Sequence, residues 1–560
     1  MIARPLRIAL GDLSYINAAN ATNSNVGWQN NLYVPLNIGY LASYAKRKFG
    51  KDIEVALFKD PAEMIDRVRR WRPDLIGLSA YYWNAELDKL MVRKARAISG
   101  YAPVIVMGGP SIDSDQAEKS LYGVGNPGVD VFLPNEGEEG FATLVGYMVG
   151  GCTFAPRDMP VPLGLKTDLD ELPSPYLDGT LDQFMDGPFQ PMIQTSRLCP
   201  YTCHFCVSGK NRGKLRAFAL DQVREELAYI GKRFNDRPEH VLHIVDENFG
   251  ILDRDIEVAK FVRDTKSVYG YPNKVFFYND KRFTSIARDV HETVAGMVYH
   301  GVCLSLQSEN PETLKAISRR NLTDEQVTSA IGWAHGRGVK TSTELIFGLP
   351  MENRKSFRLL LDKCARLGFD SILCYNLIIF DGIEMNRASY REQYRLRTMR
   401  RLMHGNSGWI DGELCVESEE VVVESSTFGF DDYKYFRAMN TLFHAIFING
   451  LHLDFFRRLV ASGASLTDFL ERMLAPTGGQ GYAEEKHGMW LAELDVAMDL
   501  ELYDDEHLAS IIAEAKAGRM DLPSEIKVQP IFARKLSDNE HGWVARIIER
   551  LAQDQKQMVA

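Results

Sequence analysis

Short apolar runs alternate with helical patterns through the first 150 residues and again between residues 191 and 379. This alternation constrains the fold most strongly, because strands separated by helices pair in parallel and need helices over both faces of the sheet. The first series predicts a doubly wound, Rossmann-like α/β domain over residues 1–150. Ligands of such domains lie at the carboxyl ends of the strands. The segments expected there are rich in Gly and Asn: NAANATNSNVGWQNN, SAYYWN, GGPSIDS and NEGEEG.

The second series follows residues 151–185, whose Pro, Gly and Asp content is typical of a linker. Its expected strands are 191–195, 241–245, 274–278, 302–306, 341–347 and 371–379. Six such units predict a partial TIM-like (β/α)6 barrel over residues 186–385 rather than an eight-unit barrel. Beyond it, residues 386–560 are expected to form a mostly helical domain with one hairpin at GELCVESEEVVVES.

Composition narrows the class of function. A chain of 560 residues is too long for one core, and its formal charge of −10 disfavours a nucleic-acid partner. The sequence offers neither a signal-peptide pattern nor an uncharged run long enough to span a membrane, which leaves the cytoplasm as the expected location. A small molecule or peptide is therefore the expected substrate.

Three of the eight Cys residues crowd into TSRLCPYTCHFCVSGK, at Cys199, Cys203 and Cys206. In a reducing compartment, thiols this close together indicate metal binding or catalysis. One loop with this spacing can wrap an iron–sulfur cluster, and three ligands leave one iron open for chemistry. A zinc site completed by His204 is the alternative, although no second Cys or His pair follows at zinc-finger spacing.

The thiol spacing, with Phe205 just before the third Cys, resembles the signature of the radical S-adenosylmethionine (SAM) enzymes. The resemblance implies that Cys199, Cys203 and Cys206 hold a 4Fe-4S cluster whose open iron chelates SAM. Reductive cleavage of SAM would then yield a 5′-deoxyadenosyl radical, with the electron coming from an external donor such as flavodoxin or ferredoxin.

Further motifs of this family match the ends of later expected strands. VDENF resembles the motif that receives the methionine amino group, LSLQSEN stands where relatives often carry Glu-Ser, and STELIFGLPMEN resembles the segment beside the adenine and ribose. Gln307 replaces the usual Glu, which leaves the ribose partner open. The resemblance thus implies SAM contacts from Asp246, Glu247, Asn248, Gln307, Ser308, Glu344 and Gly348.

The first domain lacks the G-x-G-x-x-G fingerprint of dinucleotide binding after its first strand. Its pattern of VPLNIGYLASYAKRKFG, PDLIGLSAYY, VIVMGGPS and VDVFLPNEGEEGF instead resembles the cobalamin-binding domain of the cobalamin-dependent radical SAM enzymes. That resemblance implies that the cobalamin tail lies against Ser79, Gly108, Gly109, Pro110, Glu136 and Gly137. A relic of the fold that binds no cobalamin is the alternative.

No His precedes His204 in the sequence, and the loop that carries a cobalt-ligating His in many cobalamin proteins begins here Asp12-Leu13-Ser14. An imidazole of this domain therefore cannot ligate the lower cobalt face. Cobalt without a strong axial donor is easily reduced, which suits repeated methylation from SAM.

The expected activity is a cobalamin-dependent radical SAM C-methyltransferase that transfers a methyl group from methylcobalamin to an unactivated carbon. The alternative keeps both cofactors but ends in cyclisation, ring rearrangement or oxidation. RNA methylthiolation is disfavoured because that family carries further Cys in its first domain, whereas no Cys precedes Cys152 here. An iron–sulfur sensor that does not turn over SAM is a rival of another class. We expect no protein general base, and so assign no catalytic side chain.

Overall fold

The computed structural model describes residues 4–16, 32–151, 167–209, 214–522, 527–538 and 542–559. The Asn-rich segment at 17–31, most of the expected linker, and Cys152 lie outside these ranges. The chain forms two compact units, and neither is one continuous stretch of sequence. The first comprises 1–299, 380–387 and 405–419, and the second comprises 300–379, 388–404 and 420–560.

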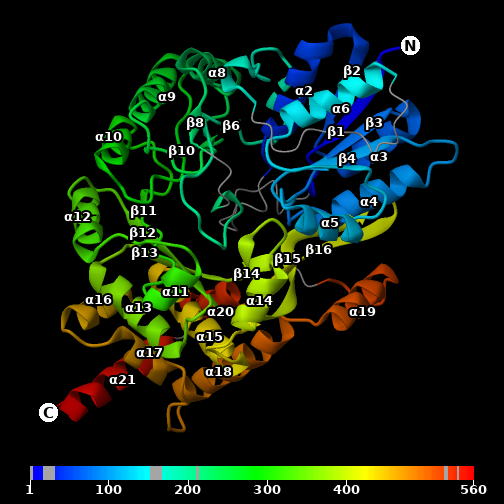
Figure 1. Cartoon of the computed structure of the whole chain (residues 1–560). Coiled ribbons are helices and arrows are strands. Elements are labelled where there is room, and N and C mark those ends of the chain that lie inside the picture. The colour runs from blue at the N-terminus through cyan, green and yellow to red at the C-terminus, as the bar shows by residue number, and fades with distance from the viewer. Residues whose placement is uncertain are drawn as a thin grey trace. The chain divides into compact units, whose positions relative to one another are not determined.

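The first unit contains a parallel sheet of five strands in the order β2-β1-β3-β4-β5. Figure 1 labels β1, β2, β3 and β4 of this sheet. The central strands are apolar and buried because both faces of the sheet are covered. Their bounds are Leu6–Gly11 (β1), Ile53–Phe58 (β2), Leu75–Ser79 (β3), Val104–Gly108 (β4) and Val131–Leu133 (β5).

Helices cover the two faces of this sheet separately. Those packed in one core are α2 (Leu36–Phe49) and α6 (Glu138–Val149), and those in the other are α3 (Pro61–Trp71) and α4 (Ala85–Arg96). Helix α5 (Gln116–Gly125) starts at Asp115, whose carboxylate accepts hydrogen bonds from two amides of its first turn. This cap satisfies donors that have no partner inside the helix.

The remainder of the first unit contributes a short parallel sheet, β10-β9-β6, and a two-stranded antiparallel pair, β7 and β8. The elements are α7 (Asp182–Met185), β6 (Met192–Ile193), β7 (Ser196–Arg197), β8 (Arg216–Ala217), α8 (Leu220–Arg233), β9 (Leu242–Ile244), α9 (Asp255–Tyr269), β10 (Val275–Phe276) and α10 (Ser285–Thr293).

The second unit has its own parallel sheet, in the order β11-β12-β13. Its elements are β11 (Val302–Cys303), α11 (Pro311–Ala316), α12 (Asp324–His335), β12 (Thr341–Phe347), α13 (Arg354–Leu367), β13 (Ser371–Asn376), β14 (Ile378–Ile379) and α14 (Ala388–Tyr394). The expected α/β fold with parallel sheets is therefore confirmed. Closure of the strands of the second series into one six-stranded barrel stays a prediction.

A long hairpin joins β15 (Arg397–Ile410) and β16 (Glu413–Glu424). The hairpin expected inside GELCVESEEVVVES was wrong, because that segment is one strand and its partner precedes it. The turn is the dipeptide Asp411-Gly412, and both residues have positive φ, 51° and 76°. Asp-Gly suits a two-residue turn whose twist matches the strands.

In the part of β16 that belongs to the first unit, Glu417 is buried. Its carboxylate accepts hydrogen bonds from the amides of Glu86, at 2.9 Å, and Leu87, at 3.1 Å, at the start of α4. The Tyr15 hydroxyl donates to the same carboxylate at 3.1 Å. A carboxylate at this end of a helix is stabilised by the free amides and the helix dipole.

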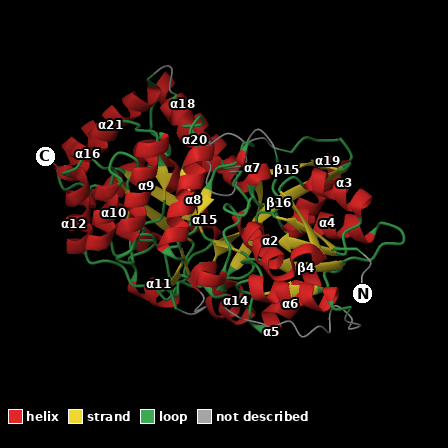
Figure 2. Cartoon of the chain, turned by 90° about the horizontal axis from the view of Figure 1, so that it is seen from above, coloured by secondary structure: helices red, strands yellow, loops and turns green. Residues whose placement is uncertain are grey.

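The C-terminal region of the second unit is mostly helical, as expected, and Figure 2 shows most of these segments as helices. They are α15 (Phe430–Phe447), α16 (Leu453–Ala461), α17 (Leu466–Met473), α18 (Tyr482–Leu500), α19 (Asp505–Lys516), α20 (Val528–Ser537) and α21 (Trp543–Val559). Within the described residues, none of the helices has the length and apolar composition required to span a bilayer.

Candidate functional site

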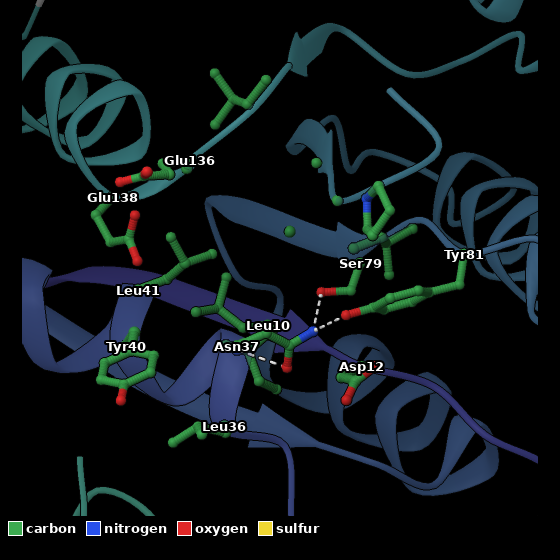
Figure 3. Close-up of a pocket in the computed structure, with 18 of the residues that line it drawn as sticks. Leu10, Asp12, Leu36, Asn37, Tyr40, Leu41, Ser79, Tyr81, Glu136 and Glu138 are labelled. Atoms are coloured by element: carbon green, nitrogen blue, oxygen red, sulfur yellow. Dashed lines mark hydrogen bonds between the residues drawn. The ribbon is translucent and has the colours of Figure 1, made fainter. Parts of the chain in front are cut away.

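A cavity of about 510 Å³ opens at the carboxyl ends of the five-stranded sheet in the first unit. Leu10 of β1 and Leu36 of α2 give part of its wall an apolar character, and Figure 3 shows these side chains around the space. All six residues expected to contact a cobalamin tail are part of this wall. They are Ser79, Gly108, Gly109, Pro110, Glu136 and Gly137.

The backbone at the end of β4 requires glycine. Gly109 has a φ of +110°, and a Cβ atom added there would lie 2.8 Å from the carbonyl oxygen of Ala80. The Ala80 amide also donates to the Gly108 carbonyl, at 2.6 Å. The ends of β3 and β4 are therefore drawn close together, and a ligand can approach bare backbone.

Asn37 of α2 organises the polar part of the cavity wall. Its amide Nδ2 donates to the Ser79 hydroxyl at 3.0 Å and to the Tyr81 hydroxyl at 3.1 Å (Figure 3). Its Oδ1 accepts from the Ile38 amide at 2.8 Å, which sets the orientation of the side chain. Sequence reasoning missed Asn37 and Tyr81, although both stand in motifs that it had quoted.

A buried ion pair forms another part of the wall. The Lys59 ammonium lies 2.9 Å from the Asp12 carboxylate, and the side chains are 7% and 10% exposed. Asp12 follows β1 and Lys59 follows β2, so pairing of these strands brings them together. Ser14, two residues beyond Asp12, also borders the cavity.

Arg197 of β7 connects this wall to the thiol loop. Its guanidinium donates to Glu138 at 2.7 Å, to Glu136 at 3.3 Å and to Gln194 at 3.1 Å. It also lies over the ring of Tyr40, 5.2 Å from its centroid. Burial alone raises the pKa of Glu138, but attraction to Arg197 outweighs it and lowers that pKa below its ordinary value. The sequence contained no local signal for this network.

The three cysteines lie on the loop that follows Arg197. The Cys206 amide donates to the Cys203 carbonyl at 3.1 Å, which folds the loop into a turn. The Asn248 amide donates to the Cys199 sulfur at 3.0 Å, and the Lys281 ammonium lies 3.8 Å from the Cys203 sulfur.

This donor set suits a thiolate-ligated cluster, since amide and ammonium donors stabilise charged sulfur. Across the described ranges, no three His, Cys, Asp or Glu side chains are placed to hold a single metal ion.

The acidic residues that follow β9 differ in their roles. Asp246 is buried, and its carboxylate accepts hydrogen bonds from the Thr195 amide at 2.6 Å, the Thr195 hydroxyl at 2.5 Å and the Ser196 hydroxyl at 2.8 Å. Burial raises the pKa of Asp246 despite these bonds. Asp246 thereby holds the segment just before the thiol loop, whereas Glu247 borders the cavity.

The other residues expected to contact SAM belong to the second unit. Gln307 has a φ of +64°, and its backbone amide donates to the Glu344 carbonyl at 2.9 Å. Its buried Oε1 finds no hydrogen-bond partner among the residues that the structure describes. The Ser305 hydroxyl donates to the Glu344 carboxylate at 2.7 Å, and the Ser308 hydroxyl donates to Glu352. Gly348, directly after β12, has a φ of +88°.

One family model matches part of the chain. The family model of the radical SAM superfamily matches residues 193–364, the stretch that carries the three cysteines and the motifs described above. The radical SAM resemblance read from the sequence motifs is confirmed for this stretch of the chain.

Two of the similar curated proteins are named as methyltransferases, and one of them as cobalamin-dependent. The chain is 29% identical over 442 residues to the 2-(S-pantetheinyl)-carbapenam-3-carboxylate methyltransferase of Streptantibioticus cattleyicolor. It is 29% identical over 436 residues to the cobalamin-dependent radical SAM methyltransferase TokK of Streptomyces tokunonensis. Each match covers 72% of this chain and 61% of the relative, so the chain spans about three fifths of the length of these curated relatives.

A solved structure shares the fold. The radical SAM methyltransferase TsrM of Kitasatospora setae aligns with a TM-score of 0.51 over 71% of this chain and 78% of its own. The sequence identity is 16%, so this likeness concerns the fold alone.

Proposed function

We propose that this protein is a cobalamin-dependent radical SAM methyltransferase that delivers a methyl group to an unactivated carbon of a small molecule or peptide. The observation that carries the proposal is the cavity of about 510 Å³, whose wall includes all six residues expected to contact cobalamin. The three-cysteine loop belongs to the same compact unit. Similarity to two curated methyltransferases over 72% of the chain supports the same conclusion.

The residues around the cavity fit the tail of a corrinoid. Leu10, Leu36 and neighbouring side chains offer an apolar surface for a heterocyclic base, and the bare backbone at Gly108 and Gly109 admits close approach of a polar chain. Ser14 stands where many cobalamin proteins place an imidazole ligand. Since no His precedes His204, residues 1–150 would hold the corrinoid without an imidazole ligand of their own.

We assign the cluster to Cys199, Cys203 and Cys206. SAM contacts are proposed for Asp246, Glu247, Asn248, Gln307, Ser308, Glu344 and Gly348. When bound, these cofactors supply a carbon radical that takes hydrogen from the substrate, together with the methyl group. The tasks of the chain are to hold the reactants in line and to exclude water and competing hydrogen donors.

The domain assignment is part of the proposal: a cobalamin-binding domain at 1–150, a linker at 151–185, a radical SAM barrel at 186–385 and a helical domain at 386–560. An external flavodoxin or ferredoxin supplies electrons, and the substrate is not a nucleic acid. Pantetheine-bearing carbapenam carboxylates are the first substrates to test, because one curated relative is named for such a compound.

The test is anaerobic reconstitution with iron, sulfide and hydroxocobalamin, followed by incubation with SAM, a reductant and candidate substrates. We expect absorbance from both cofactors, a product heavier by one CH₂ unit, and formation of S-adenosylhomocysteine together with 5′-deoxyadenosine. Turnover with 5′-deoxyadenosine but neither methylated product nor S-adenosylhomocysteine would replace methyl transfer by the cyclisation, rearrangement or oxidation alternative.

A further inference from the structure

Two hydrogen-bond donors from neighbouring strands of one sheet are directed at the thiol loop. The Asn248 amide, after β9, lies 3.0 Å from the Cys199 sulfur. The Lys281 ammonium, after β10, lies 3.8 Å from the Cys203 sulfur. Cys203 is 3% exposed, so solvent screens this interaction little.

The position of Lys281 is supported by its surroundings. Its ammonium lies over the ring of Tyr201, 5.2 Å from the centroid. The Tyr201 hydroxyl in turn donates to the Asp280 carboxylate at 2.9 Å, and Asp280 is fully buried. A lysine held between an aromatic ring and a sulfur has lost much of its conformational freedom, so its charge acts from a defined place.

An iron–sulfur cluster becomes more negative by one charge when it accepts an electron. Positive charge and hydrogen bonds at the ligating sulfurs stabilise that reduced form, and both raise the reduction potential. The effect is large at short range in a partly buried site.

We propose that Lys281 and Asn248 tune the cluster held by Cys199, Cys203 and Cys206, raising its reduction potential so that the external donor can reduce it. The inference rests on the proposed function only in requiring that the loop hold a cluster. It assigns Asn248 a task that is independent of SAM.

The test is an anaerobic redox titration of the reconstituted full-length protein, without SAM or cobalamin, in which electron paramagnetic resonance measures the reduced cluster. We expect Lys281→Gln to lower the ratio of reduced to oxidised cluster at least tenfold at a given potential. That change corresponds to a shift of 59 mV to more negative potential. Lys281→Arg, which keeps the charge, is expected to change the ratio less than threefold.

Arg282→Gln is the matched control. It removes one positive charge at the next position, where the side chain is 61% exposed and lies 3.8 Å from Asp280. We expect less than a threefold change in the ratio. An equal shift in both Gln variants, or no shift in Lys281→Gln, would overturn the role of Lys281.

Iron and sulfide content are measured before each titration. If Lys281→Gln does not bind a cluster, the titration is done with Asn248→Leu instead. This variant removes the other hydrogen-bond donor and keeps the size of the side chain. A tenfold lower ratio in that variant supports the proposal, and an unchanged ratio overturns it. Failure of the wild-type protein to form any four-iron cluster would refute the proposed function itself.

Discussion

Replacing Arg197 by Met removes one of the buried positive charges beside the cavity. The Arg197 side chain is 10% exposed, and the shortest of its three side-chain hydrogen bonds described above is the 2.7 Å bond to Glu138, whose side chain is 6% exposed. Without it, the donors that remain to Glu138 among the described residues are the Thr167 hydroxyl and a backbone amide. Loss of one partner of a buried ion pair costs about 3–5 kcal/mol. Because Glu136 retains Arg216, we expect Arg197→Met to lower the free energy of unfolding by about 3 kcal/mol.

The assay is urea unfolding of the full chain at pH 7, followed by circular dichroism and by tryptophan fluorescence. Agreement of the two transitions is needed before a free energy is assigned. Arg224→Met is the control, because its ion pair with Asp221 is exposed at both ends and is expected to contribute less than about 1 kcal/mol.

We also expect the loss of stability in Arg197→Met to depend on pH. The folded-state pKa of Glu138 lies below its ordinary value, so the stability from this pair is present above about pH 4.3. It is lost as pH falls through the folded pKa, because the carboxylate is then protonated. The difference between wild type and Arg197→Met should therefore shrink in acid. A difference below about 0.5 kcal/mol at pH 7, or additive effects in a double-mutant cycle with Glu138→Gln, would refute the reasoning.

The remaining predictions use other parts of the structure. Gly109→Ala should destabilise the protein and weaken cobalamin binding, since its φ is +110° and the new Cβ meets backbone; thermal unfolding is compared with Gly100→Ala, where φ is also positive but space is open. Changing any of the three loop cysteines to Ser should reduce bound iron measured after reconstitution, whereas Cys364→Ala, at a buried site, should retain it. Burial raises the pKa of Glu417 to about 7, so stability should fall from about pH 4.5 to 7 as this group is forced to ionise. In urea unfolding measured between pH 4.5 and 7, Glu417→Gln should reduce this fall in the free energy of unfolding by up to about 3 kcal/mol. The same dependence of stability on pH in wild type and variant would contradict the raised pKa of Glu417.

The strands and helices of both series were predictable because burial on two faces leaves continuous apolar runs, such as VIVMG of β4. The cavity position was predictable for the same reason, since parallel strands present their carboxyl ends at one edge. The hairpin was expected one strand too late in the sequence, although the Asp411-Gly412 dipeptide marks its true turn.

The contacts that join the parts of the site could not be predicted from local pattern. Arg197 lies 59 residues from Glu138, and Lys281 lies 78 residues from Cys203. Such pairs depend on packing between elements whose spacing a pattern does not define. In the sequence, Arg197 is one charged residue among many, two positions before the first Cys of the loop. Its partners can be identified only in the folded structure.

The residue whose carboxylate caps α4 is synthesised long after the helix itself. Glu417 lies 331 residues beyond the Glu86 amide that it accepts from. At ribosomal speeds of about 5–20 residues per second, roughly 17–66 s of synthesis separate the two. During that interval a nascent chain holds the beginning of α4 without its final acceptor. A fragment cut at Tyr299 would keep this state permanently, which makes such a truncation a poor substitute for the intact protein.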